Sequence, residues 1–336
     1  MIVTILNFIK QYMQYLMIGC IAAGLANVYF EGGFTIPKDI LVLTVVIFVI
    51  YPVMVNTRFE EIFAHFKEPR PLFCSLVINF ILSPVAAFVL GRLFLSDQPA
   101  LFSALLLIAL LPTSSMSVAW TSFSGARVAT ALYLIPLNIL FAAFVGLPLI
   151  FPFLMGDMIM VNQVTIIKNI GIVFFVPLLL GDISRRLIIR LKGEPYFKEA
   201  VKPNLGGVSA LGILVLIFMV MSLKRNSVLI ENVSLILLII APVVLYYGGI
   251  YLVSYGWARF LVYRNMPGNK AVVIVFTSVA RHINIAIAIA LSTFSLDVSA
   301  LMLMVFIIAY IIQVPSLAFF FQKFGKTMAV TGTPDG

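Results

Sequence analysis

Long apolar runs separated by short polar segments dominate the chain. A bilayer core takes about 20 apolar residues per helix, so each long run predicts one membrane-spanning helix. The predicted spans are residues 12–29, 40–55, 71–95, 100–123, 127–152, 164–183, 204–223, 232–260, 270–294 and 299–321. The pattern therefore predicts an all-α integral membrane protein with ten transmembrane helices.

Composition agrees with this pattern. Hydrophobic residues make up 62% of the chain and charged residues 10%, against roughly 45–50% and ~25% in a soluble domain. A soluble fold is therefore excluded. The two cysteines, Cys20 and Cys74, lie in apolar runs far from histidine, which argues against a disulfide framework or a thiolate metal site.

The basic residues predict how the chain crosses the membrane. When both termini and every loop after an even-numbered span are placed on one side, that side carries most lysines and arginines. The other side carries Lys38, Arg92, Lys168, Lys224 and Arg225. The positive-inside rule then predicts a multi-pass protein of the cell membrane with both termini in the cytoplasm.

The net charge of +9 is interpreted as topology and lipid contact, not as nucleic acid binding. Residues 185–202 mix arginine and lysine with leucine, isoleucine and aromatic residues, and we expect a cytoplasmic loop lying on anionic lipid there. The predicted partners are the lipid bilayer and a small anionic solute. The sequence indicates no particular oligomeric state.

The spans divide into two halves. Residues 1–155 hold the first five-helix repeat, residues 156–322 hold the second, and residues 323–336 form a short cytoplasmic tail. An odd number of spans per half makes the second half enter the membrane in the opposite sense. This is the arrangement of inverted-repeat transporters.

Spans four and nine are interrupted at equivalent places in the two halves. Residues 111–117 contain Pro112 and a run of hydroxyl side chains, and residues 277–284 contain a polar run with an arginine. Proline blocks a helical hydrogen bond, and backbone outside the helical ladder is tolerated only inside protein or beside water. Paired broken helices of this kind predict a transporter binding site near the midplane.

Arg281 falls inside the ninth span, and no carboxylate lies at the midplane of any predicted span. An ionised arginine at that depth costs several kcal/mol unless it finds a partner. We predict that Arg281 holds a substrate anion. The alternative is a fixed structural cation neutralised by carbonyls at the end of a broken helix.

Neutral polar residues accompany Arg281 in the predicted site. Hydroxyl oxygens in the first break suit a sodium ion or an oxyanion, and His282 is a candidate for proton coupling. The predicted substrate-binding residues are Arg281, Asn284, Thr113, Ser114 and Asn138. The predicted ion-binding residues are Ser115, Ser117, His282 and Asn79, and the coupling ion is left open between Na⁺ and H⁺.

The sequence carries no catalytic or metal-binding pattern. It lacks a Walker A phosphate loop, and its two histidines, His65 and His282, lie in different regions. We therefore expect no enzyme activity, no catalytic residue, no metal site and no cofactor besides a coupling ion.

The two interrupted segments also resemble a known family. Residues 111–125 with Asn138, and residues 280–294 with their alternating Ile-Ala run, are similar to the fourth, fifth and ninth helices of the bile acid:sodium symporter superfamily, above all its arsenite-permease branch. The resemblance implies a panel domain of spans 1, 2, 6 and 7 and a core domain of spans 3–5 and 8–10. It also implies two crossing broken helices and alternating access by movement of the core against the panel.

Two departures from that family bear on substrate and ion. Arsenite permeases carry a cysteine directly after the proline of the fourth helix, where this chain has Thr113, and trivalent arsenic prefers thiolate. Sodium-coupled members place a glutamate in the ninth-helix crossover, where this chain has Arg281, His282 and Asn284. A positive charge there opposes sodium binding.

These observations favour a secondary transporter of a small anionic or oxyanionic solute. An efflux permease for arsenite or a related metalloid is the alternative within the same class. A membrane receptor that keeps the transporter fold and binds a ligand without moving it is the alternative of another class.

Overall fold

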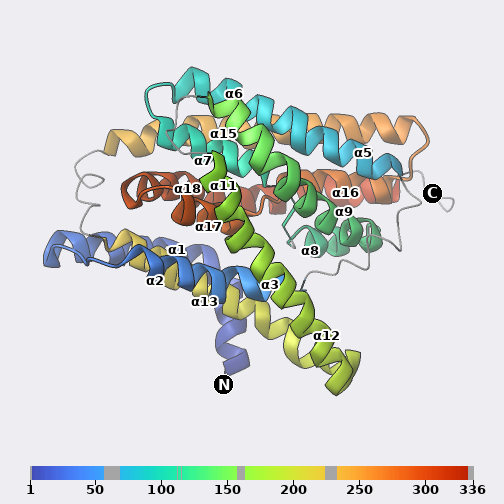
Figure 1. Cartoon of the computed structure of the whole chain (residues 1–336). Coiled ribbons are helices and arrows are strands. Elements are labelled where there is room, and N and C mark those ends of the chain that lie inside the picture. The colour runs from blue at the N-terminus through green and yellow to red at the C-terminus, as the bar shows by residue number, and fades with distance from the viewer. Residues whose placement is uncertain are drawn as a thin grey trace. The chain divides into compact units, whose positions relative to one another are not determined.

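The computed structural model describes residues 2–56, 69–111, 113–114, 116–156, 163–223 and 233–331, and every regular element in these ranges is a helix (Figure 1). The first helices are α1 (Ile2–Glu31), α2 (Lys38–Thr44), α3 (Tyr51–Asn56), α5 (Pro69–Val77), α6 (Ser83–Phe94), α7 (Pro99–Leu110), α8 (Met116–Phe123), α9 (Val128–Phe141) and α10 (Phe151–Met155). They are followed by α11 (Gln163–Ile170), α12 (Val176–Tyr196), α13 (Lys202–Met221), α15 (Val233–Tyr263), α16 (Gly268–Val279), α17 (Ile283–Thr293), α18 (Leu296–Phe320) and α19 (Lys326–Val330). Short π-helical segments join several of them: η1 (Val45–Ile50), η2 (Ile78–Leu82), η3 (Ala142–Ile150), η5 (Gly171–Phe175), η6 (Phe197–Val201) and η8 (Phe321–Gly325).

Seven helical segments among the described residues are long and apolar enough to cross a membrane. They are Lys38–Asn56, Pro69–Phe94, Val128–Met155, Ile167–Met221, Ser234–Tyr263, Gly268–Thr293 and Leu296–Val330. Two shorter apolar helices are Tyr15–Glu31 and Pro99–Leu110. The predicted all-α class is confirmed, whereas the number of ten spans stays a prediction.

The segment between predicted spans six and seven is helical, which corrects the expectation of a loop there. α12 continues through its basic residues, and η6 joins it to α13. Gly193 has a φ of 85°, a left-handed conformation open to glycine, and Pro195 follows it. Gly193 is therefore a non-helical kink between two helical stretches, and leucine, arginine and lysine, which are good helix formers, fill the stretch before it.

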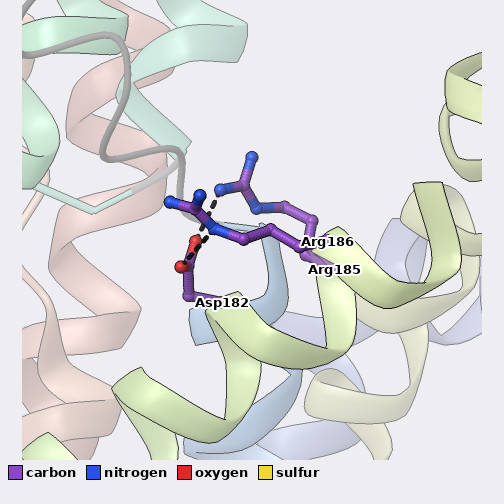
Figure 2. Close-up of polar contacts among 3 residues, drawn as sticks. All are labelled: Asp182, Arg185 and Arg186. Carbon is purple, nitrogen blue, oxygen red and sulfur yellow. Dashed lines mark hydrogen bonds and ion pairs between the residues drawn. The ribbon is translucent and has the colours of Figure 1, made fainter. Parts of the chain in front are cut away.

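Asp182 pairs with two arginines one turn further along α12 (Figure 2). Oδ1 of Asp182 lies 2.6 Å from Nη2 of the buried Arg185, and Oδ2 lies 2.7 Å from Nε of the exposed Arg186. Spacings of three and four residues place these side chains on one face of the helix. One carboxylate thus offsets part of the positive charge of two guanidinium groups.

The chain forms two compact units. The first consists of the described residues in Met1–Thr57, Val161–Leu237 and Ile287–Met304. In it, α1 packs along α13 and α3 packs against α12. The close approach of α3 and α12 depends on Gly181, because a Cβ there would meet the backbone of Met54 and Val55 at 2.8 Å.

The end of α17 is capped within this first unit. Nζ of Lys38 donates to the carbonyls of Phe294 at 2.7 Å and Ser292 at 3.3 Å, and Nδ2 of Asn169 also donates to Ser292 at 3.0 Å. The last carbonyls of a helix lack partners inside the helix and carry its negative dipole end. A lysine and an asparagine from elsewhere in the unit satisfy them.

The second unit consists of the described residues in Arg58–Met160, Leu238–Ala286 and Val305–Gly336. Its centre is α16, which contacts α5, α8, α9 and α19. In an 18-residue stretch of the span that contains α16, 94% of the residues are buried, whereas the share in a stretch of equal length in Ser234–Tyr263 is only 33%. α16 is therefore enclosed by protein, and all residues 101–110 of α7 are buried as well.

Candidate functional site

Both interruptions predicted from the sequence occur in the second unit, and their backbones bind each other. The helix ends before Leu111 in the first break and before Ala280 in the second. The Ser114 N–H donates to the Ala280 carbonyl at 2.7 Å, and the His282 N–H donates to the Leu111 carbonyl at 2.8 Å. Backbone groups that leave the helical ladder thus satisfy one another, as a membrane interior requires.

Thr113 adds a side-chain link to this pairing. Its Oγ1 donates to the Thr277 carbonyl at 2.9 Å, and the side chain is fully buried. Its φ of 66° is left-handed, a conformation that β-branched residues rarely adopt. Strain of this kind costs about 1–3 kcal/mol and persists only where the surroundings enforce it. Thr113 therefore links the first break to α16 while its backbone is held in a strained conformation.

The serines of the first break cap α8. Oγ of Ser114 accepts the Met116 N–H at 3.3 Å, and the Ser114 carbonyl accepts Oγ of Ser117 at 2.8 Å. A serine ahead of a helix satisfies one of the N–H groups that have no partner inside it. Ser115 and Pro112, which the sequence also singled out, lie outside the described residues.

Arg281 lies at the second break with its side chain only 1% exposed. Nη1 donates to the Ala109 carbonyl at the end of α7 at 3.1 Å, and the guanidinium carbon lies 5.8 Å from the ring centroid of Tyr246. Nε and Nη2 have no hydrogen-bond partner in the part of the chain that the structure describes. Among the described residues no carboxylate forms an ion pair with Arg281. The site thus contains a buried cation with two unused donor atoms.

Gln313 of α18 holds the backbone of Arg281. Its Oε1 accepts the Arg281 N–H at 2.7 Å and the Tyr247 hydroxyl at 3.0 Å, and its Nε2 donates to the Arg281 carbonyl at 3.4 Å. One amide therefore serves both backbone groups of Arg281. This contact fixes the position from which the guanidinium extends.

Ser83 and Tyr246 hydrogen-bond to each other beside the guanidinium of Arg281. Oγ of Ser83 donates to the Ala109 carbonyl at 3.1 Å, and its oxygen lies 2.7 Å from the Tyr246 hydroxyl. The Ala109 carbonyl therefore accepts from both Ser83 and Arg281. α6, α7 and α15 all contribute to the setting of one cation.

Three further polar atoms near the second break are buried without a hydrogen-bond partner within the described ranges. They are Oγ of Ser278, Nε2 of His282 and Oδ1 of Asn284. Most buried polar groups in folded proteins are hydrogen-bonded, so such atoms are expected where a ligand, ion or water binds. With Nε and Nη2 of Arg281, five unsatisfied atoms fall within residues 278–284.

Asn79 and Asn138 form a separate polar cluster with Ser75. Nδ2 of Asn138 donates to Ser75 at 2.9 Å and to the Leu134 carbonyl at 2.8 Å, while Nδ2 of Asn79 donates to Ser75 at 3.1 Å and to Oδ1 of Asn138 at 3.3 Å. These bonds join α5, η2 and α9, and none reaches either break. Oδ1 of Asn79 is buried and has no hydrogen-bond partner among the residues that the structure describes. The predicted site residues therefore divide into two groups.

No group of three or more His, Cys, Asp or Glu side chains in the described part of the chain is placed to hold a metal ion. Two of the five unsatisfied atoms at the second break, Nε and Nη2, are nitrogen donors of the Arg281 cation. Such an arrangement suits a negatively charged oxygen.

Comparison with known families decides the class. The model of the Sodium Bile acid symporter family matches residues 43–231, more than half of the chain. The chain belongs to this family. The family resemblance is thereby confirmed, and the matched residues include 111–125 but not 280–294. The protein is a multi-pass membrane transporter.

Individual relatives of this symporter-family protein share modest identity over most of its length. It is 25% identical over 276 residues to the arsenical-resistance protein Acr3 of Corynebacterium glutamicum, covering 78% of this chain and 71% of the relative. It is 22% identical over 332 residues to Acr3 of Alkaliphilus metalliredigens, covering 92% and 90%. An uncharacterized transporter of Synechocystis is 24% identical over 299 residues, covering 83% and 76%. The predicted likeness to the arsenical-resistance branch is also confirmed.

Sequence reasoning found both breaks and Arg281 in this symporter-family protein but missed the residues that position Arg281. Gln313 could have been noticed as an amide within an otherwise apolar final span. Ser83, Tyr246 and Tyr247 resemble ordinary packing residues in the sequence. Only the fold reveals that they meet at Arg281 or at its partners.

Proposed function

We propose that this member of the sodium bile acid symporter family is a secondary-active transporter of a small anion or oxyanion, with Arg281 as the residue that binds it. The observation that carries the proposal is the buried guanidinium, whose Nε and Nη2 have no partner among the described residues. Asn284 and His282 are proposed to complete the substrate and ion sites, since each has an unpartnered buried atom beside the same break.

Energetics support an anionic ligand. A charge in a low-dielectric interior is costly unless it is paired, and guanidinium cannot escape by losing its proton. The Ala109 carbonyl accepts one donor of Arg281 but supplies only the partial negative charge of a helix end. A bound anion offsets the remaining charge and satisfies two donors at once, which suits the forked geometry of arginine.

The finer topology is part of this proposal. We propose ten spans in two inverted repeats, residues 1–155 and 156–322, with both termini on the cytoplasmic side of the cell membrane. Support comes from the seven long and two short apolar helices, because the 55-residue segment Ile167–Met221 covers two predicted spans. The two compact units broadly follow the predicted panel and core, which supports alternating access by their relative movement.

The coupling ion is proposed to be Na⁺ or H⁺. The hydroxyls of Ser114 and Ser117 hydrogen-bond to backbone groups at the start of α8, and Asn79 bonds to Asn138. Of the predicted ion-binding residues, Asn79 and His282 each have a buried acceptor, Oδ1 and Nε2, with no hydrogen-bond partner among the described residues, which can accept a cation or a proton. Flux measured with a sodium gradient and, separately, with a proton gradient distinguishes the two ions.

The test of anion transport uses Arg281→Met and the matched control Arg259→Met, which changes an exposed arginine of α15. The purified proteins are screened for thermal stabilisation by organic anions and oxyanions, and then for flux in proteoliposomes. We expect at least one anion to stabilise and to cross with wild type and Arg259→Met but not with Arg281→Met. Anion binding and flux that persist in folded Arg281→Met protein contradict the proposal. Binding without flux in the wild type indicates a receptor on the transporter fold.

A second candidate function is efflux of arsenite or a related metalloid, and the two Acr3 relatives favour it. Neither cysteine of the chain lies in a break, because Cys20 is in α1 and Cys74 is in α5. Expression in a metalloid-sensitive host tests this candidate. Arsenite resistance together with arsenite flux in proteoliposomes supports it, and unchanged sensitivity with well-expressed protein counts against it.

A further inference from the structure

The charge distribution of the second compact unit narrows the class of anion. Within the described residues of that unit, Arg281 is the only buried lysine or arginine. The same residues include a single carboxylate side chain, Asp97, which is exposed and lies in the turn between α6 and α7. The buried part of the unit that the structure describes therefore carries one positive charge and no negative charge.

We infer that the Arg281 site selects anions of a single negative charge over dianions and neutral solutes. The inference rests on the proposed function, because it assumes that the substrate binds to Arg281. It adds a charge state to the substrate class and predicts the order in which related anions bind.

The desolvation cost of an anion and its attraction to Arg281 grow differently with the charge of the anion. The desolvation cost of an ion grows with the square of its charge, whereas its attraction to one fixed cation grows in proportion to its charge. Doubling the ligand charge thus quadruples the cost and only doubles the gain. With Arg281 only 1% exposed, water does not screen the second charge of a dianion.

The groups around Arg281 strengthen the preference for an anion of a single negative charge. The Ala109 carbonyl at the end of α7 and the Tyr246 ring face already place partial negative charge beside the guanidinium. A monoanion completes the neutralisation. A second negative charge would meet these groups with no further cation to offset it. A neutral solute, in turn, would leave the charge of Arg281 without a counter-ion.

The experiment compares methanesulfonate with sulfate, which are similar in size and geometry and differ by one negative charge. Uptake of each radiolabelled anion is measured in proteoliposomes holding full-length wild type, Arg281→Lys, Arg281→Gln or the control Arg259→Gln, at matched ionic strength. We expect wild type and Arg259→Gln to take up methanesulfonate with an apparent affinity at least ~10-fold higher than for sulfate. Arg281→Lys keeps the preference, and Arg281→Gln loses uptake of both.

Each other outcome has a defined meaning. Sulfate uptake that equals or exceeds methanesulfonate uptake and depends on Arg281 overturns the charge-state inference but leaves anion transport intact. Uptake of either anion that is unchanged in Arg281→Gln overturns the proposed role of Arg281. The absence of saturable uptake of both anions by wild type at ~100 mM overturns the small-oxyanion site and this inference with it. The wild-type comparison decides the charge preference even if Arg281→Gln does not fold.

Discussion

Replacing Gln313 with leucine tests whether one amide fixes the second break. The side chain is 1% exposed, and its Oε1 accepts both the Arg281 N–H at 2.7 Å and the Tyr247 hydroxyl at 3.0 Å. Leucine is similar in size, so the change removes the hydrogen bonds and opens little space. The Arg281 N–H and the Tyr247 hydroxyl would then be buried without partners.

The magnitude follows from those two donors. A buried donor left unsatisfied costs about 1–3 kcal/mol, so Gln313→Leu destabilises the protein by about 2–6 kcal/mol. At roughly 2 °C per kcal/mol for a large chain, the apparent Tm falls by about 4–12 °C. Tyr247→Phe removes one hydroxyl but leaves the bond between Gln313 and Arg281. It therefore costs only about 0.5–1.5 kcal/mol.

Thermal unfolding of the purified proteins in one detergent measures these effects. Gln322→Leu is the matched control, because it makes the same exchange at an exposed position of η8, which follows α18 directly. We expect wild type and Gln322→Leu to have the highest Tm, Tyr247→Phe a lower Tm and Gln313→Leu the lowest. A Tm for Gln313→Leu within about 1 °C of the control refutes the reasoning, since no buried group would then depend on the amide.

Two further predictions concern the first compact unit and use the same assay. Gly181→Ala lowers the Tm because its Cβ would meet the backbone of Met54 and Val55 at 2.8 Å. The control Gly256→Ala in α15 has nothing within 4 Å of the new Cβ and raises stability by up to about 1 kcal/mol. Equal Tm values for the two variants would show that α3 and α12 separate freely. Asp182→Asn lowers stability by about 1–3 kcal/mol because the buried Arg185 loses its carboxylate at 2.6 Å. Glu194→Gln breaks an exposed pair and lowers stability by under about 1 kcal/mol. A larger loss of Tm in Glu194→Gln than in Asp182→Asn contradicts this prediction.

Local signals in the sequence predicted much of the fold. Apolar runs identified the membrane helices, and Pro112 with the polar residues 277–284 identified both breaks, because proline and polar side chains disturb a helix wherever they occur. The same signals failed at residues 185–202. A high content of charged residues indicated a loop, yet arginine, lysine and leucine also favour helix, and the structure is helical there.

The candidate site was predictable only in part, because its contacts join residues that are distant in sequence. Arg281 stood out because any buried cation needs an explanation, and this holds without knowledge of the fold. Its partners did not stand out: the Ala109 carbonyl is 172 residues away, and Gln313 is 32 residues away. Carbonyl groups are present at every position, so no residue type marks the one that accepts from a guanidinium.

The hydroxyl residues of the first break make backbone contacts that the sequence did not indicate, for the same reason. The sequence predicted Thr113, Ser114 and Ser117 as ligand-binding oxygens, and in the structure each hydroxyl bonds to the protein backbone. A broken helix leaves backbone N–H and C=O groups without partners, and in a membrane these groups must form hydrogen bonds within the protein. Hydroxyls at a break therefore first stabilise the break itself. We propose that the group left for a ligand is the one whose charge the backbone cannot neutralise, the guanidinium of Arg281.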